Sequence, residues 1–165
     1  MADPTYILGI HDGHNCGASV SCDGVVVASL SEERLSRKKN EVGYPRRSVE
    51  AVLALARIKP SELSAIVYAS LFMHKESYLT ELDKWYCVGI EEQRADSCKP
   101  TDYQKMIFKQ RKAERINVVC SHLEQTKSKV HFIEHHLAHL TAAYYTAPNI
   151  APGQTALGLT CDGAG

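Results

Sequence analysis

The sequence lacks long apolar runs, an excess of charge of either sign and any signal peptide. Its 19 basic residues balance 19 acidic residues, so no overall field draws the chain to nucleic acid or to an anionic membrane. The apolar stretches are too short for a transmembrane helix, and residues 1–4 have neither the basic nor the apolar region of a secretion signal. The sequence therefore predicts a cytoplasmic protein with no membrane partner.

Cysteine spacing and aromatic content exclude two further classes. None of the 6 cysteines forms a Cys-x-x-Cys pair, which argues against a structural zinc knuckle. Several lie in strand-like runs, so we expect them to be small buried apolar residues. Aromatic residues make up 7% of the chain and are sparse near its basic segment, which argues against a surface for single-stranded nucleic acid.

The apolar pattern predicts an α/β fold, and 165 residues suffice for one domain with a hydrophobic core. Tyr6–Ile10 is typical of a strand buried on both faces, and Asp23-Gly24 predicts a hairpin between the strands 18–21 and 25–29. Further strands are predicted at 65–70, 130–133 and 155–160, and helices at 49–56, from 101 to about 127 and from 135 to about 145. Residues 71–115 are interpreted as a helical insertion, with a capping box at Thr101 and Gln104.

Residues 34–47 are predicted to form a basic loop, because Gly43 and Pro45 interrupt any helix there. The segment holds six basic residues against Glu41, a net charge of +5. Its Arg37-Lys38-Lys39 run could neutralise an anionic substrate such as a phosphate. A solvated charged loop explains the same composition.

The turn after the first strand, Asp12-Gly13-His14-Asn15-Cys16-Gly17, is the first candidate site. A glycine turn between two strands exposes backbone N–H groups that can hold phosphate oxygens. Asp12 could position a metal-bound water, and His14 could act as a general acid or base. A tight turn stabilised by Asx side chains is the alternative.

The second candidate site is a predicted helix with three histidines among five residues, 135–139. His135 and His139 lie about 40° apart around a helix, whereas His136 lies about 60° beyond His139. Imidazole suits zinc, iron, nickel or manganese better than magnesium, and the missing glutamate of HExxH excludes a zincin. His135 and His139 are therefore predicted to hold a divalent metal ion, with hydrogen bonding at the first helical turn as the alternative.

An internal echo adds a third candidate site. Residues 157–163 resemble residues 7–13, since both are apolar runs that end in Asp-Gly. If the echo is a repeat, a second structural unit begins near residue 155. Asp162 would then be a further metal ligand and Gly163 would approach a phosphate, although many Asp-Gly pairs are only turns.

Several separated motifs together resemble the O-carbamoyltransferases of nodulation and antibiotic biosynthesis. In chain order they are Ile-Leu-Gly-Ile-His-Asp-Gly-His-Asn at 7–15, Ser-Glu-Glu-Arg at 31–34, Lys-Lys-Asn at 38–40, Gly-Tyr-Pro at 43–45, His-His-Leu-Ala-His at 135–139 and the closing Asp-Gly. The resemblance covers the chain except for about 71–115. A looser likeness reaches the tRNA threonylcarbamoyl-transferases, which carry a similar two-histidine metal motif.

The resemblance implies an actin-like, ribonuclease-H-like ATPase fold, a mixed sheet flanked by helices, with a first lobe at 1–153 and the start of a second at 154–165. Members of the family are longer. A separate C-terminal domain makes carbamoyl-adenylate from carbamoyl phosphate and ATP, and the actin-like part transfers the carbamoyl group to a hydroxyl of a small-molecule acceptor. The chain thus resembles an N-terminal fragment that is inactive without the missing C-terminal domains.

Motif matching also implies residue roles. The resemblance assigns metal binding to His135, His139 and Asp162, nucleotide contact to Asp12, Gly13, Asn15 and Gly163, and catalysis to His14 and Lys39. The implied metal is iron, with zinc and manganese as alternatives.

Three other functions stay open. An actin-fold sugar kinase would rely on magnesium and carboxylates, so the histidine pair counts against it. A tRNA threonylcarbamoyl-transferase would bind nucleic acid, which the neutral charge does not favour. The third is a non-catalytic nucleotide-binding module.

Overall fold

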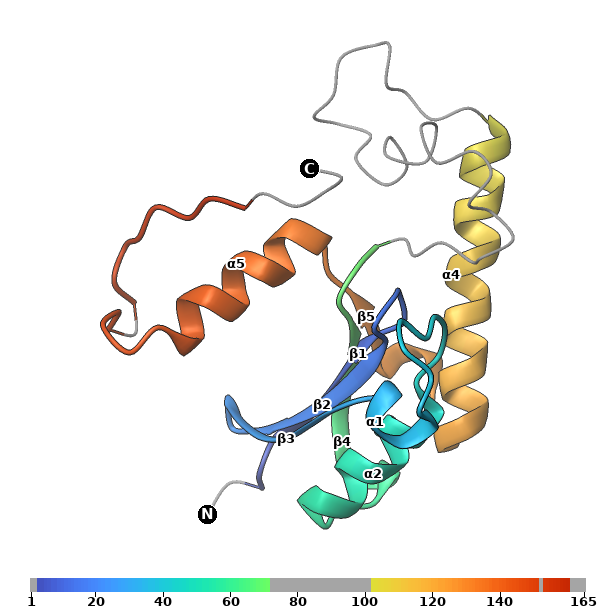
Figure 1. Cartoon of the computed structure of the whole chain (residues 1–165), viewed down its shortest axis with the longest axis horizontal. Helices are drawn as coiled ribbons and strands as arrows, with labels where there is room; N and C mark the ends of the chain where they lie inside the picture. The colour runs from blue at the N-terminus through green and yellow to red at the C-terminus, as the bar shows by residue number, and fades with distance from the viewer. Residues whose placement is uncertain (1–2, 72–101, 152, 161–165) are drawn as a thin grey trace.

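A computed structural model of the chain describes residues 3–71, 102–151 and 153–160 (Figure 1). These residues build one mixed five-stranded sheet in the order β3-β2-β1-β4-β5. The strands are β1 (Tyr6–His11), β2 (Gly17–Cys22), β3 (Val25–Ser31), β4 (Leu63–Tyr68) and β5 (Val130–Phe132). The predicted α/β class and the five strands before residue 134 are confirmed.

Helices flank the sheet on two sides. They are α1 (Glu33–Ser36), α2 (Arg46–Ala56), α4 (Asp102–Leu123) and α5 (His135–Thr146), with 3₁₀ turns η1 (Pro60–Glu62) and η4 (Lys127–Lys129). Helices α2 and α4 contribute to the hydrophobic core on one face, and α5 lies on the opposite side (Figure 1). Within the described ranges, no helix combines the length and apolar character needed to span a bilayer.

Strand direction determines where the loops meet. β1 and β3 each pair antiparallel with β2, whereas β1, β4 and β5 run parallel to one another. The predicted Asp23-Gly24 turn is confirmed, with positive φ values of 50° and 84° that match a tight hairpin. Because parallel strands end at the same edge, the segments that follow β1, β4 and β5 lie together.

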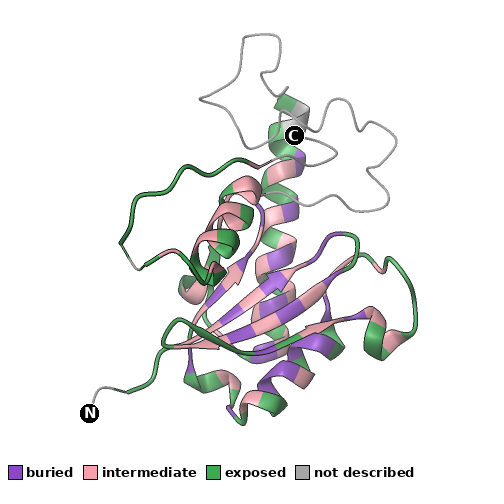
Figure 2. Ribbon diagram, turned by 60° about the vertical axis from the view of Figure 1, so that its left-hand side comes forward, coloured by how far each residue is buried: buried purple, intermediate pink, exposed green. Residues whose placement is uncertain are grey.

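The core lies between the sheet and the α2/α4 layer (Figure 2). On β1, Leu8 and Ile10 face this layer and are almost fully buried, whereas Gly9 and His11 alternate onto the other face. The predicted register of α2 is confirmed, since Val49 and Val52 are completely buried against the sheet.

A polar chain joins α4 to α2 beside this core. The hydroxyl of Tyr44 lies 2.7 Å from Nδ1 of His122, and Nε2 of His122 lies 3.0 Å from the carboxylate of Glu50. In the neutral tautomer with the proton on Nε2, His122 accepts from Tyr44 and donates to Glu50. Burial raises the pKa of Tyr44, which keeps its hydroxyl protonated as a donor. The link fixes the 43–45 segment against α4.

The N-terminus of α2 is capped from a distance. Pro45 precedes the helix and provides no side-chain cap. Instead the buried carboxylate of Glu32, at the end of β3, accepts the backbone N–H groups of Arg47 at 3.2 Å and Ser48 at 2.7 Å. These N–H groups have no partner inside the helix, so the carboxylate provides their hydrogen-bond acceptor. Its negative charge also interacts favourably with the positive end of the helix dipole.

Replacing Glu32 by alanine is expected to lower the free energy of unfolding by about 1–2 kcal/mol, because two backbone N–H groups, of which that of Ser48 is buried, lose their acceptor. Urea denaturation followed by circular dichroism measures the change. Glu33→Ala is the matched control, since Glu33 has no part in this cap, and it should change stability by less than about 0.5 kcal/mol. Equal effects of the two substitutions would contradict the capping role.

The strand predicted at 155–160 is wrong. The described residues there adopt neither strand nor helix, and Leu157 and Leu159 are 102% and 93% exposed. An apolar alternation forms a strand only where a neighbouring backbone accepts and donates its hydrogen bonds. Within the described residues, no strand pairs with this segment.

The predicted basic loop at 34–47 is wrong at both ends. Helix α1 already contains Arg34, and α2 begins at Arg46. Between them, Arg37 and Asn40 adopt left-handed φ values of 64° and 54°, which end α1 after one turn and reverse the chain.

One helix prediction also needs correction. α4 ends at Leu123 rather than near 127, because Glu124 takes a positive φ of 53°. The predicted helix from 135 is confirmed as α5, but it buries none of its residues, and Leu137 is 48% exposed. Residues 102–115 belong to α4, whereas 72–101 lie outside the described part, and with them Thr101 of the predicted capping box.

Candidate functional site

The candidate site lies at the edge where β1, β4 and β5 end. In open α/β sheets, ligands bind at the carboxyl ends of parallel strands. Backbone bonds hold these ends together: the N–H of Ala69 donates to the carbonyl of Ile10 at 2.9 Å, and that of Ile133 to the carbonyl of Tyr68 at 3.1 Å. The 12–16 turn follows β1, and the histidine helix α5 follows β5.

The 12–16 turn is tied to the segment after Lys39. The N–H of Gly43 donates to the carbonyl of Asp12 at 3.0 Å, and the N–H of Cys16 donates to the carbonyl of Glu41 at 3.1 Å. His14 and Val42 form an isolated β-bridge between these two bonds. The structure thus brings the predicted turn and the predicted basic segment together, with the side chains of Lys39 and His14 exposed.

His11 is a site residue that sequence reasoning missed. Its Nε2 lies 3.1 Å from the backbone carbonyl of His14 and donates to it. Burial lowers the pKa of His11, and the charges of His14 and His135 act in the same direction against the raising effects of that carbonyl and Asp12. A neutral His11 therefore supports the turn through its bond to the carbonyl of His14.

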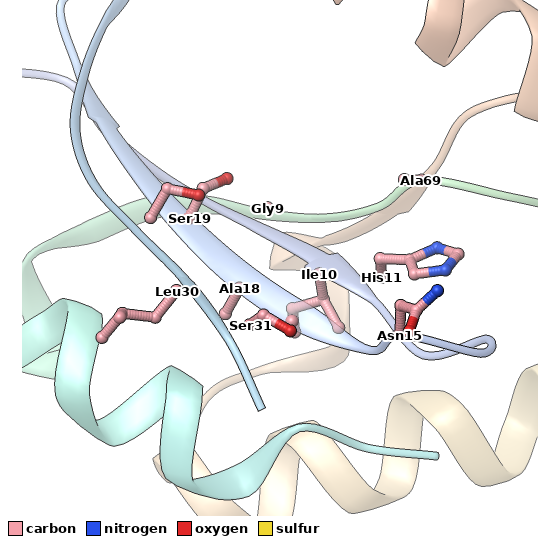
Figure 3. Close-up of a pocket in the computed structure, with 11 residues that line it drawn as sticks. Gly9, Ile10, His11, Asn15, Ala18, Ser19, Leu30, Ser31 and Ala69 are labelled. Carbon is pink, nitrogen blue, oxygen red and sulfur yellow. The ribbon is translucent and has the colours of Figure 1, made fainter. Parts of the chain in front are cut away.

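A cavity of about 330 Å³ opens beside the turn on the sheet face away from α2 (Figure 3). His11 and Asn15 lie close together at one end of it, and Gly9, Ser19 and Ser31 contribute small groups along the strands. A Cβ atom on Gly9 would lie 2.8 Å from the hydroxyl of Ser19, which would have to rotate away. The volume suits a small molecule beside His11, whose ring centre lies 6.5 Å from that of His14.

Asp12 has an ion-pair partner that the sequence did not reveal. Its carboxylate is 2% exposed and accepts from Nε and Nη2 of Arg115, both at 2.9 Å. Arg111 adds a contact of 3.3 Å. Both arginines lie on α4 in the i, i+4 stripe that continues through the buried Val119 and Leu123. Because these arginines share the spacing of the apolar stripe, the sequence pattern could have indicated that they are buried and therefore need an acidic partner.

The guanidinium of Arg115 uses all five of its N–H donors. Besides the two bonds to Asp12, it donates to the carbonyls of Ser70 and Leu71 at 3.1 and 3.3 Å and to the hydroxyl of Ser70 at 3.2 Å. Its central carbon lies 4.4 Å from the ring centre of Tyr68. Burial lowers the pKa of Arg115, and the adjacent Asp12 opposes that shift.

The two predicted metal-binding histidines converge. Nε2 of His135 and Nε2 of His139 lie 3.1 Å apart, with their rings edge to face. This separation suits two imidazoles that bind one metal ion at about 2.0–2.1 Å. It also suits an N–H···N hydrogen bond between neutral rings.

A glutamate caps the histidine helix. Glu134 accepts the N–H of Leu137 at 2.8 Å. Partial burial acts to raise the pKa of Glu134, but the backbone N–H groups of Leu137 and His136 and the nearby histidines lower it overall. The cap orients the first turn of α5, which carries His135.

The histidine pair supplies two ligands, and a metal ion needs more. Within the described residues, no three His, Cys, Asp or Glu side chains are grouped to hold a metal ion. The predicted third ligand, Asp162, and the predicted phosphate contact, Gly163, lie outside the described residues. The metal site stays a prediction.

The predicted burial of cysteines is confirmed for Cys16, which is 1% exposed. Burial and the nearby carboxylates, Glu32 foremost, raise the pKa of its thiol to about 11. Cys22 and Cys120 are half-buried, and the other three cysteines lie outside the described residues. Cys16 therefore stays a neutral thiol and is no nucleophile at neutral pH.

Comparison with known proteins identifies the family. Residues 6–165 match the protein family described as Carbamoyltransferase N-terminus. The chain belongs to this family. The matched range includes the 12–16 turn, Lys39 and the histidine helix, and the predicted resemblance to carbamoyltransferases is confirmed.

Individual relatives of this carbamoyltransferase domain come from bacteria and an archaeon. Nodulation protein NolNO of Sinorhizobium fredii is 29% identical over 160 residues, which cover 94% of this chain and 20% of NolNO. Protein sll1178 of Synechocystis is 29% identical over 154 residues, 87% of this chain and 24% of that protein. Protein MJ1051 of Methanocaldococcus jannaschii is 39% identical over 70 residues, 42% of this chain and 13% of that protein. The chain spans a quarter or less of these relatives.

Proposed function

We propose that this chain is the N-terminal domain of an enzyme that moves a carbamoyl group from carbamoyl-adenylate to a hydroxyl of a small-molecule acceptor. The observation that carries the proposal is the family match over residues 6–165. The arrangement at the sheet edge supports it, since the exposed His14 and the histidine pair follow strands that end together. The cavity reaches this edge at His11 and Asn15. A mixed sheet with helices on both sides supports an actin-like first lobe.

The chemistry is acyl transfer from a mixed anhydride. The acceptor oxygen forms a bond to the carbamoyl carbon, the bond from that carbon to the AMP phosphate oxygen breaks, and the hydroxyl proton must be removed. His14 is the proposed general base, because its imidazole is exposed on a turn held by backbone hydrogen bonds, and its ring centre lies 6.5 Å from that of His11, which lines the cavity. The cationic Lys39 offsets the charge of the anionic donor.

The residues present fit a divalent metal ion, which His135, His139 and Asp162 would hold, iron before zinc or manganese. When bound, the ion would orient phosphate oxygens and stabilise AMP as it leaves. Histidine at both described positions explains a preference for a metal softer than magnesium.

The proposal is tested on the full-length protein that carries this domain. Incubated with ATP and carbamoyl phosphate, it should form AMP only when both compounds and a hydroxyl acceptor are present. Chromatography of the nucleotides measures the product. AMP formation that does not depend on carbamoyl phosphate would contradict the proposal, and so would its complete absence across a panel of sugars, aminoglycosides and polyketides.

The double substitution His135→Ala/His139→Ala is expected to remove the bound metal, because two imidazole ligands are lost together. Mass spectrometry of metal content in purified protein checks this, with about one ion per chain expected in the unsubstituted protein. His131→Ala is the control, since His131 is exposed on β5. Equal metal content in the double variant and the control would contradict the assignment.

A further inference from the structure

We propose that Arg115 is a positioning residue for carbamoyl transfer, holding the 12–16 turn so that His14 faces the reacting hydroxyl. The inference rests on the proposed function of His14. Arg115 is 1% exposed, so it acts on the reaction through Asp12 and touches no substrate itself.

The first step is that Arg115 joins the ends of two strands. Two of its bonds reach Asp12, the residue directly after β1, and three reach Ser70 and Leu71, which follow β4. One planar group therefore sets the distance and angle between these two strand ends. The turn that carries His14 starts at one of them.

The second step concerns what the guanidinium rests on. It lies against the ring of Tyr68 on β4 and, at 4.9 Å, against the ring of Phe132 on β5, and these two rings stack at 5.2 Å. The hydroxyl of Tyr68 donates to the backbone carbonyl of Arg115 at 3.0 Å. Phe132 lies three residues before His135, so the same cluster also supports the strand that leads into the histidine helix.

The third step is that Asp12 passes this restraint to both sides of the turn. Its side chain is fixed by Arg115, while its backbone carbonyl accepts from Gly43 in the segment that follows Lys39. The residues between Asp12 and Cys16 thus have an anchor on α4 and another on the 41–43 segment. A change at Arg115 loosens the anchor on α4 and, through Asp12, weakens the backbone bonds to the 41–43 segment.

Lysine cannot replace arginine in this role. The ammonium group of lysine has three donors on one nitrogen, whereas the guanidinium of Arg115 uses five donors in one plane to bind Asp12, Ser70 and Leu71. Arg115→Lys keeps the charge beside Asp12 but cannot hold both strand ends at once. The substitution therefore separates geometry from charge.

The test is the steady-state kinetics of Arg115→Lys in the full-length protein. Misplacement of a catalytic group by about 1 Å costs on the order of 100-fold in rate, so kcat should fall by about 10- to 100-fold while KM for the acceptor changes less than about 2-fold. Val52→Ala is the control for stability, because it creates a cavity in the core cluster, which includes no residue of the 12–16 turn. It should lower Tm and leave kcat unchanged.

Amide hydrogen exchange provides a readout that does not need activity. In Arg115→Lys the N–H groups of Cys16 and Gly43 should exchange at least about 10-fold faster relative to that of Leu8, since they hold the turn. Val52→Ala should change all three together. If wild type transfers no carbamoyl group, the proposed function fails, and the exchange rates still decide whether Arg115 holds the turn.

Wild-type kcat or wild-type exchange at Cys16 and Gly43 in Arg115→Lys would overturn the inference. If that variant does not fold, Ser70→Ala takes its place, because it removes one acceptor from the same guanidinium. A smaller loss of kcat with the same local increase in exchange is then expected. If folded Ser70→Ala has the kcat of wild type and unchanged exchange at Cys16 and Gly43, the proposed role of Arg115 is likewise overturned.

Discussion

Replacing Arg115 by methionine is expected to lower the free energy of unfolding by about 3–5 kcal/mol, the cost of breaking a buried ion pair by removing one partner. Among the described residues, the carboxylate of Asp12, 2% exposed, would keep only the 3.3 Å contact from Arg111, and acceptors on Ser70 and Leu71 would lose the donors of Arg115. Small domains are stable by only about 5–15 kcal/mol, so the variant should lie near the limit of folding. Urea denaturation measures the loss.

The surface pair of Arg46 and Glu50 provides the control. Its charged atoms lie 3.9 Å apart, with side chains 56% and 58% exposed, so Arg46→Met should cost less than about 0.5 kcal/mol. Combining Arg115→Met with Asp12→Asn should cost less than the sum of the two single substitutions, because the uncompensated charge is then gone. Similar losses in the free energy of unfolding for Arg46→Met and Arg115→Met would show that the buried pair contributes no more to stability than the surface pair.

Replacing His14 by alanine is expected to lower the rate of carbamoyl transfer by about 10²- to 10⁴-fold, the contribution typical of a general base. The fold should be unaffected, since the side chain is exposed and the turn is held by backbone groups. The rate is measured from labelled product at saturating acceptor, and circular dichroism verifies folding.

His131→Ala serves as the matched control for this substitution, because it removes another exposed imidazole from the same sheet. Its transfer rate should equal that of wild type. A His14→Ala variant that keeps a third or more of the wild-type rate would exclude His14 as the base.

Features set by short stretches of sequence were predictable. The Asp23-Gly24 hairpin depends on two residues that accept positive φ, and the register of α2 depends on apolar residues three and four apart. The spacing of His135 and His139 placed both imidazoles on one side of a helix, where they meet at 3.1 Å. Each of these follows from local geometry.

Features that need a distant partner were not predictable in the same way. Arg115 and Asp12 are 103 residues apart in the sequence. Glu32 caps α2, although α1 and the turn after it lie between Glu32 and that helix. The sequence predicted a ligand role for Asp12, and it could not reveal the arginine that pairs with this carboxylate. The segment 155–160 illustrates the reverse, since its apolar pattern has no paired strand among the described residues.

The most direct test of the central claim is the fate of the carbamoyl group. The full-length protein is incubated with ATP, carbamoyl phosphate labelled at carbon and a panel of hydroxyl compounds, and labelled carbamate ester is measured beside AMP. The account predicts ester and AMP in equal amounts from the wild type, and almost none of either from His14→Ala. AMP without labelled ester, or equal ester from both proteins, would contradict it.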